Sequence, residues 1–194
     1  MALKVGMVGF NGIAKSHAPT HRDDPLADLV AICDAVKERA DKAAEEYNCK
    51  AYYSVDDMLA NEELDIVDVT TGGLENGSWH YEAAMQAMEA GKNCLVEKPI
   101  SSDIFQAREM VALAEEMDVY LGCDLNHYFT EPAAKAKEYQ DNGQLGELVY
   151  CLAKMGFQGG EPESYTAPGS VKVKGYPYWH LKAFLTHPLS VMRH

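Results

Sequence analysis

A glycine-containing turn near the start of the chain has the residues needed to bind a diphosphate. Gly9, Asn11 and Ala14 stand at the three positions of the dinucleotide-binding fingerprint, with Gly12 and Ile13 between them. The fingerprint needs a tight turn, close approach of the backbone to the pyrophosphate, and a small residue where helix meets strand. Asn11 replaces a glycine, but asparagine tolerates left-handed backbone angles. A helix that starts here presents N–H groups and partial positive charge to the anion.

A carboxylate follows this turn at the distance expected for ribose binding. Asp34 ends the second apolar run and stands 25 residues after Gly9. Such a carboxylate accepts hydrogen bonds from the adenosine ribose hydroxyls and repels the extra phosphate of NADP. NAD is therefore the expected cofactor, although the nearby Lys37 and Arg39 keep NADP as the less favoured alternative. Asp34 can also cap the helix expected just after it, and the two roles are compatible.

Short apolar segments alternate with longer amphipathic ones, in the order needed to position such a turn. The apolar segments have four to seven residues and are rich in Val, Leu and Ile, as in strands covered by helices on both faces. We expect strands at residues 3–9, 29–34, 66–70, 94–97 and 119–123, and helices at 13–22, 36–47, 55–60, 79–90 and 104–117. This alternation predicts an α/β fold with a doubly wound parallel sheet of the Rossmann type.

The pattern changes after Cys123. We expect residues 1–123 to form an NAD(P)-binding domain and residues 124–194 to begin an α+β substrate domain. Its expected elements are a helix at 131–142, a strand at 147–157, an extended loop at 158–175 and a helix from 181. One strand and two helical segments cannot bury a core, so we expect this second domain to be incomplete, truncated or completed from outside the chain.

Composition excludes several classes of partner. The net charge of −13 argues against nucleic acid, whose binding proteins need a basic surface. No apolar run of about 18 residues predicts a membrane span, and the start of the chain lacks the layout of a signal peptide. Five scattered cysteines favour the reducing cytoplasm. His17 and His21 lie four residues apart on one expected helix, as two metal ligands can, but spacing shows no third ligand and no metal is expected.

Two further motifs give the chain a family resemblance. They are WHYEAA at residues 79–84 and MEAGKNCLVEKP at residues 88–99. With the turn at residues 9–17 and Asp34, they resemble the glucose–fructose oxidoreductase, inositol 2-dehydrogenase and rhizopine-catabolism (Gfo/Idh/MocA) family. The AGK and EKP segments are the most specific. The resemblance extends through GQLGEL at residues 143–148 to the region of His187. It implies a second domain with a large, mainly antiparallel sheet, much of it missing here, through which the protein forms a homo-oligomer.

The resemblance implies catalytic roles for two residues. Lys98 corresponds to the EKP lysine near the nicotinamide, where an ammonium can hydrogen-bond the substrate oxygen and stabilise alkoxide charge. The bond between Lys98 and Pro99 is often cis in this family. His187 corresponds to the histidine near the substrate carbon, where a neutral imidazole can take the hydroxyl proton. Alternatively, His187 only lines the pocket. Many members carry an aspartate one helical turn before this histidine, where this chain has Ala183.

Other positions are assigned by the same resemblance. On the cofactor side we expect Glu97 to bind the cofactor or to fix the loop, and His80 to contact the cofactor or to cap or pack its helix. Thr70 and Thr71 stand where Thr-Pro usually follows the fourth strand, and we expect them to offer hydroxyl and N–H groups to the cofactor. On the substrate side we expect Tyr128 and His180, with Lys182 as a further polar neighbour. His17 is expected to be structural.

Three functions follow as hypotheses. The first is an NAD-dependent oxidoreductase that transfers a hydride between the nicotinamide and a secondary alcohol of a sugar, inositol or related polyol. The second retains NAD but cleaves glycosides, or has another outcome without net redox change. The alanine at position 183, in place of the family's usual aspartate, is the reason for this hypothesis. The third is a protein that binds NAD without catalysis. In each case the expected partner is a small sugar or polyol.

Overall fold

The computed structural model describes residues 2–73, 77–152 and 179–193, with residues 179–184 described by their backbone alone. The chain divides into two compact units, Met1–Asp124 and Leu125–His194, and each is treated by itself. Within the described ranges, no helix is long and apolar enough to cross a membrane.

The first unit is built on a six-stranded sheet in which every neighbouring pair is parallel. The strands are β1 (Leu3–Val8), β2 (Ala27–Cys33), β3 (Lys50–Tyr52), β4 (Ile66–Val69), β5 (Asn93–Val96) and β6 (Leu121–Cys123). Their order, β3-β2-β1-β4-β5-β6, is that of a dinucleotide-binding sheet. The predicted Rossmann fold is therefore confirmed. Strand β3 was not expected, because three residues at the sheet edge are too short to show an apolar pattern.

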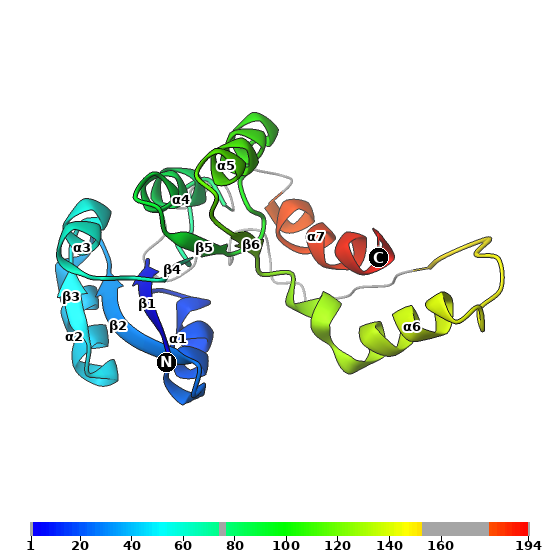
Figure 1. The fold of residues 1–194 in the computed structure, drawn as a ribbon, viewed down its shortest axis with the longest axis horizontal. Helices are drawn as coiled ribbons and strands as arrows, with labels where there is room; N and C mark the ends of the chain where they lie inside the picture. Colours follow the sequence, from blue (N-terminus) through cyan, green and yellow to red (C-terminus); the bar gives the residue numbers. More distant parts are fainter. Residues whose placement is uncertain (1, 74–76, 153–178, 194) are drawn as a thin grey trace. The chain divides into compact units, whose positions relative to one another are not determined.

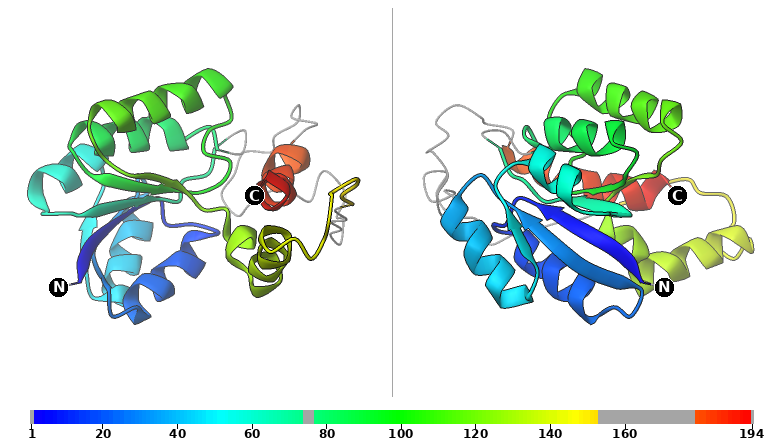
Figure 2. Two further views of the ribbon diagram at one scale, coloured as in Figure 1. Left: turned by 45° about the vertical axis from the view of Figure 1, so that its right-hand side comes forward. Right: turned by 60° about the vertical axis from the view of Figure 1, so that its left-hand side comes forward.

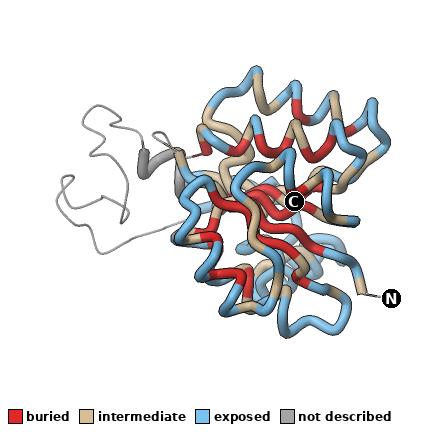
Figure 3. Tube along the Cα trace, turned by 90° about the vertical axis from the view of Figure 1, so that its left-hand side faces the viewer, coloured by how far each residue is buried: buried red, intermediate tan, exposed pale blue. Residues whose placement is uncertain are grey.

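Helices cover both faces of this sheet. They are α1 (Ala14–Asp23), α2 (Lys37–Tyr47), α3 (Val55–Asn61), α4 (His80–Glu89) and α5 (Ile104–Glu116). Figures 1 and 2 show α4 and α5 on one side of the strands and α1 and α2 on the other. Two separate apolar cores result, one beneath each layer of helices. The strands carry the almost continuous buried stretches between them (Figure 3).

Small side chains bring the helices close to the sheet. Helix α4 buries Ala83, Ala84 and Ala87, which lie on one face because residues three and four apart share a face of a helix. On the other side of the sheet, α1 buries Ala14 and Ala18 completely. Large side chains at these positions would therefore push the helices away from the strands.

The topology places one edge of the sheet for ligand binding. Parallel strands end at the same edge, and the strand order reverses between β1 and β4. Ligands of such sheets bind outside the carboxyl ends of the strands at this reversal. The turn after β1, the segment after β4 and the segment after β5 all lie at this edge.

In the second unit the described elements are helical. They are the 3-10 helix η1 (Asn126–Phe129), α6 (Glu131–Asp141) and α7 (Trp179–Arg193), and α7 packs against η1. The expected strand at 147–157 is wrong over residues 147–152, which form neither strand nor helix. A strand needs a hydrogen-bonded neighbour, and the described part of this unit offers none. Residues 153–157 and the expected loop at 158–175 lie outside the described residues. Leu148, Val149, Tyr150 and Leu152 are exposed.

Candidate active site

The β1–α1 turn has the backbone shape of a diphosphate cradle. Gly9 has a φ of 86°, and a Cβ there would lie 2.8 Å from the Cα of Thr71. Gly12 has a φ of 49° and open space where its Cβ would be. Both positions therefore favour glycine, the first because of close packing and the second because of its backbone angle. Ala14 is fully buried at the start of α1, as the fingerprint requires.

Asn11 takes up one of the N–H groups of this turn. The backbone N–H of Gly12 donates to the Asn11 side-chain Oδ1 at 2.9 Å. Gly12 and Ile13 are otherwise exposed at the start of the helix. An anion bound here would take the place of the asparagine oxygen, because both are acceptors for the same N–H group. The turn therefore fits a diphosphate once the Asn11 side chain rotates away.

Asp34 lies at the end of β2 and is 4% exposed. Its oxygens accept hydrogen bonds from the backbone N–H groups of Phe10, at 2.7 Å, and Val36, at 2.8 Å. Arg39 adds two bonds of 2.8 Å. Burial alone would raise the pKa of this carboxyl, but these hydrogen bonds outweigh it and hold the pKa below its usual value. Asp34 is therefore an anion, as ribose binding requires.

The segment after β4 connects the turn to the EKP loop. The Thr70 hydroxyl donates to the carbonyl of Gly9 at 2.6 Å, which ties β4 to the β1–α1 turn. The Thr71 hydroxyl donates to the carbonyl of Trp79 at 3.0 Å. Both hydroxyls that the sequence suggested for the cofactor thus bond to the chain itself. What Thr70 and Thr71 can offer to a ligand is therefore their backbone groups.

His80 continues this connection from the interior. It is 1% exposed, and its ring nitrogens lie 2.6 Å from the carbonyl oxygen of Thr71 and 2.8 Å from that of Pro99. Burial lowers the pKa of the ring, even though the two carbonyls favour its charged form. His80 packs as well against Gly77, where a Cβ would lie 2.8 Å from the Pro99 oxygen. The histidine thus positions the loop that contains Lys98.

The Lys98–Pro99 peptide bond is cis, as the resemblance implied. Lys98 follows β5 at the ligand-binding edge and is half-buried. Glu97 is 5% exposed, and its Oε2 accepts the backbone N–H of Lys98 at 2.9 Å. The other oxygen, Oε1, lies 3.3 Å from Nε2 of His17. Of the two roles expected for Glu97, this geometry supports fixing the loop.

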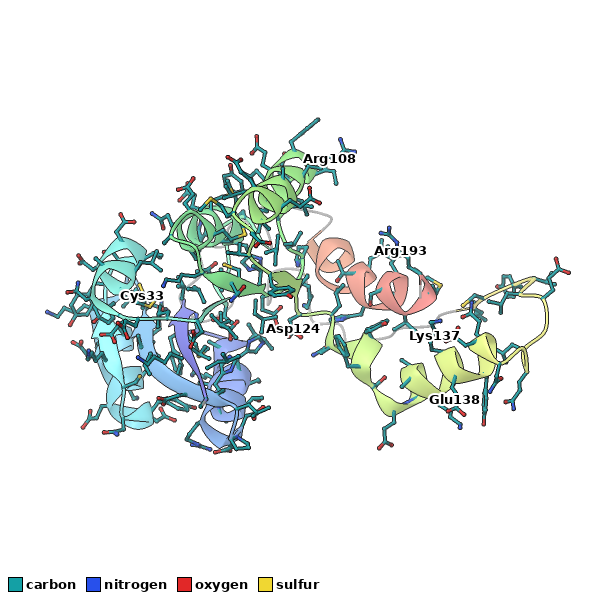
Figure 4. All side chains as sticks on the ribbon, in the orientation of Figure 1. Cys33, Arg108, Asp124, Lys137, Glu138 and Arg193 are labelled. Carbon is teal, nitrogen blue, oxygen red and sulfur yellow. The ribbon has the colours of Figure 1, made fainter. Side chains whose placement is uncertain are left out.

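A set of residues that the sequence patterns did not bring together surrounds His17. Its Nδ1 lies 2.9 Å from Oδ2 of Asp68, and its Nε2 lies 3.2 Å from Oδ2 of Asp124. Asp124 comes just after β6 (Figure 4). Burial alone would lower the pKa of this ring, but hydrogen bonds to three carboxylates outweigh it and raise the pKa to about 12. Besides the spacing of His17 and His21, an aspartate inside the apolar segment IVDVT was a sequence signal for this cluster.

The substrate-side residues belong to the second unit. His187 lies in α7, is 5% exposed, and stacks on the ring of His127 with centroids 4.0 Å apart and planes 19° apart. Tyr128 in η1 contacts Phe129 edge-on at 4.7 Å. Ala183 lies one helical turn before His187. The side chain of His180 is outside the described residues.

Comparison with known proteins decides the family. The model of the GFO/IDH/MocA oxidoreductase family, for its NAD-binding Rossmann fold, matches residues 3–125. The chain belongs to this family. Two curated members are similar to it: D-glucoside 3-dehydrogenase of Escherichia coli (strain K12), and inositol 2-dehydrogenase/D-chiro-inositol 3-dehydrogenase of Lactiplantibacillus plantarum. The first is 32% identical over 154 residues and the second 27% over 176.

These Gfo/Idh/MocA relatives are longer than the chain. The first match covers 78% of this chain and 43% of the relative, and the second covers 87% and 48%. The chain thus spans less than half the length of these curated relatives.

Two solved structures have the same fold with different cofactors bound. Scyllo-inositol dehydrogenase from Lactobacillus casei, with NAD(H) and scyllo-inositol, is 24% identical with a TM-score of 0.69. The match covers 76% of this chain and 43% of that one, and it shows a shared fold only. A 3-ketoreductase from Actinomadura kijaniata, bound to NADP, is 25% identical with a TM-score of 0.66, over 74% of this chain and 44% of that one. Members of the fold thus use either NAD or NADP.

Proposed function

We propose that this protein is an NAD-dependent oxidoreductase that acts on a secondary alcohol of a sugar, inositol or related polyol. The observation that carries the proposal is a continuous series of contacts between the two halves of the site. Thr71 packs against Gly9 in the diphosphate turn, and His80 joins the Thr71 carbonyl to that of Pro99 beside Lys98. A loop held in this way keeps Lys98, which follows β5, at the same sheet edge as the turn.

The chain's own residues would divide the work between binding and proton chemistry. The β1–α1 turn would hold the diphosphate with its N–H groups, and Asp34 would accept the ribose hydroxyls. When bound, NAD supplies the ring that accepts the hydride. Lys98 would hydrogen-bond the hydroxyl oxygen of the substrate and stabilise its negative charge as the proton leaves. His187 would take that proton at a ring nitrogen, so that the alcohol becomes a ketone.

The carboxylate of Asp34 favours NAD in this proposal. A 2′-phosphate would meet a buried anion there, and the repulsion is strong because little water screens it. Arg39 is the group that could offset it, since an arginine at this position can bind the phosphate. In this structure the guanidinium bonds to Asp34 itself.

A second candidate retains NAD but has no net redox outcome, such as the cleavage of a glycoside. Ala183 favours it, because the family's usual aspartate would orient the histidine and raise its basicity from this position. A base weakened in this way would suit a reaction in which the alcohol is oxidised only transiently.

The complete gene product tests these alternatives directly. We expect NADH to form when NAD is mixed with a panel of inositols, aldoses and glycosides, and chromogenic glycosides to remain intact. Release of the chromophore without NADH would favour the second candidate. If calorimetry shows NAD binding but neither the alcohols nor the chromogenic glycosides are turned over, the protein binds the dinucleotide without catalysis.

Two further proposals concern location and assembly. We propose the cytoplasm as the location, because all five cysteines are free thiols. Self-association through the sheet of a second domain follows from the family resemblance, and light scattering of the gene product tests it.

A further inference from the structure

Two histidines and an aspartate meet on the side of the sheet covered by α1. His17 and His21 lie one helical turn apart, so their rings share a face of α1. Both reach the same atom of Asp68, a residue of β4 with no exposed surface. His17 Nδ1 lies 2.9 Å and His21 Nε2 lies 2.7 Å from Asp68 Oδ2. The side chains of the histidines are 10% and 15% exposed.

Two more carboxylates stand behind His17. Glu97 Oε1 lies 3.3 Å and Asp124 Oδ2 lies 3.2 Å from its Nε2. Three carboxylates therefore surround one mostly buried ring. Buried negative charges need positive partners, because loss of water raises the energy of an unpaired ion. The cluster is thus suited to a cation.

One atom shows that a proton alone does not complete the cluster. Among the described residues, the Oδ1 atom of Asp68 is buried and has no hydrogen-bond partner. When the His17 ring is doubly protonated, its Nδ1–H faces Asp68 Oδ2 and its Nε2–H faces Glu97 and Asp124. The Oδ1 atom of Asp68 is still left unsatisfied. Nearly all buried polar atoms in proteins have a partner, so this one indicates a missing group.

We propose that His17, His21 and Asp68 bind a divalent transition metal, for which Zn²⁺ is the best match. Imidazole nitrogen and carboxylate oxygen are its usual ligands, with a water in the fourth position. Nδ1 of His17, Nε2 of His21 and either oxygen of Asp68 supply three donors. The second oxygen of Asp68 then contacts the metal or its water, which satisfies Oδ1.

The distances suit such an ion after a small adjustment. The ligand atoms of these three residues all lie within 4.8 Å of one another. Tetrahedral zinc with bonds of about 2.0–2.1 Å holds its donor atoms about 3.3 Å apart. His21 and Asp68 would therefore separate by roughly half an ångström when the ion enters.

The surroundings complete the site. A metal on Nδ1 of His17 leaves its Nε2–H to donate to Glu97 and Asp124, and such carboxylates orient the ring of a ligating histidine and raise its basicity. His21 also lines a groove of about 370 Å³ at the surface of the first unit, together with Asp24, Ile66 and Cys94. That groove gives an ion and its water access from solvent.

Zinc binding by the untagged, chelator-treated chain tests the proposal. We expect isothermal titration with ZnCl₂, and metal analysis after dialysis, to give one Zn²⁺ per chain. His21→Gln and Asp68→Asn should lose this binding, and Glu97→Gln should weaken it by about 10-fold. His127→Gln is the matched control, because it removes an exposed histidine of the second unit. Its stoichiometry should equal that of the wild type.

A second measurement covers the case in which Asp68→Asn does not fold. Cobalt(II) in the wild type should show the intense visible bands of a tetrahedral site, and His21→Gln should lose them. The absence of saturable zinc binding would overturn the proposal, as would zinc binding unchanged in His21→Gln. So would a nuclear magnetic resonance spectrum in which the His17 ring stays doubly protonated at zinc saturation. None of these readouts depends on oxidoreductase activity, so the two proposals fail independently.

Discussion

The guanidinium of Arg39 donates to both oxygens of Asp34, from Nε to Oδ2 and from Nη2 to Oδ1, each at 2.8 Å. A carboxylate has about four acceptor sites, and the N–H groups of Phe10 and Val36 occupy two more. The ribose of a dinucleotide can therefore bond to Asp34 only when Arg39 moves away. Arg39 can do so, because it lies in the first turn of α2 with a side chain that is 35% exposed.

Replacing this arginine should therefore favour NAD. In Arg39→Gln, the two acceptor sites of Asp34 that the guanidinium occupied are open to the ribose. We expect the NAD dissociation constant to fall by about 3- to 10-fold, the equivalent of one modest hydrogen bond. NADP binding should weaken instead. Calorimetry measures both, with Lys42→Gln, an exposed lysine of the same helix, as the control. Weaker NAD binding in Arg39→Gln would mean that the guanidinium contacts the dinucleotide rather than competing with it.

Asp34 should also make the free energy of unfolding depend on pH in the acid range. Its pKa is lower in the fold than in the unfolded chain, so its contribution is present above the unfolded value of about 3.9 and is lost as pH falls through the folded value. We expect Asp34→Asn to reduce the free energy of unfolding at pH 7 by about 1–3 kcal/mol. Arg39 contributes less to this than a fully buried partner would, because its side chain is 35% exposed and water screens the pair.

Urea unfolding at pH 7, 5, 4 and 3 measures this difference. The gap between wild type and Asp34→Asn should be constant from pH 7 to about pH 5 and should narrow below about pH 4. A gap that widens in acid would contradict the assigned direction of the pKa shift.

Asn11 should weaken diphosphate binding in the wild type. Its Oδ1 accepts the N–H of Gly12, and an incoming phosphate must displace it. Asn11→Gly should bind NAD about 3- to 10-fold more tightly, since one neutral hydrogen bond is worth about 1 kcal/mol. Asn11→Ala removes the same oxygen but retains a Cβ, so comparing the two separates competition from crowding. If both variants bind NAD more weakly, the asparagine helps to hold the phosphate.

The two glycines of the turn should differ when they are replaced. Gly9→Ala puts a Cβ 2.8 Å from the Cα of Thr71 and should cost about 2–4 kcal/mol of stability through overpacking and strain. Gly12→Ala meets open space and should cost only about 1 kcal/mol for its left-handed angle. Thermal unfolding compares them. Equal melting temperatures would show that β1 and the segment after β4 do not pack as described.

His80 should affect turnover more than cofactor binding. The neutral ring donates its one N–H to the carbonyl of Thr71 or to that of Pro99, and His80→Phe removes this donor from a buried acceptor, at a cost of about 1–3 kcal/mol. The Lys98 loop should then lose its position, so that kcat falls while the NAD dissociation constant changes little. Tyr81→Phe, which removes only a surface contact with Glu109, is the control. A loss of NAD affinity without a change in kcat would instead place His80 on the cofactor.

Much of the first unit could be predicted because its strands are buried on both faces. Each then appears in the sequence as a short apolar run between amphipathic segments. Strand β3 could not be found in this way, since Lys50 is exposed and the strand has three residues. The segment from Leu148 to Leu152 is rich in apolar residues, as buried strands are, and this pattern predicted a strand. Without a neighbouring strand in the described part of its unit, the segment stays exposed.

Candidate site residues could be predicted where a motif is local in sequence. Gly9, Asp34 and Lys98 each belong to such a motif. The cluster around His17 is different, because β4, β5 and β6 each supply one carboxylate at or after their strands, and only parallel packing brings them to α1. Spacing along the chain therefore could not reveal a third ligand beside His17 and His21. Asp68, a charged residue in the middle of an apolar strand, was the sequence feature that indicated a buried polar site.

The proposed function depends most on Lys98 acting at the same site that holds the dinucleotide. Lys98→Met in the complete gene product tests this, with NAD affinity from calorimetry and the rate of NADH formation measured on the same preparation. We expect NAD to bind about as tightly as in the wild type and the rate to fall by about 10²- to 10³-fold, the usual cost of losing one group that stabilises charge in a transition state. An unchanged rate, or a wild-type protein that binds no NAD, would contradict the account.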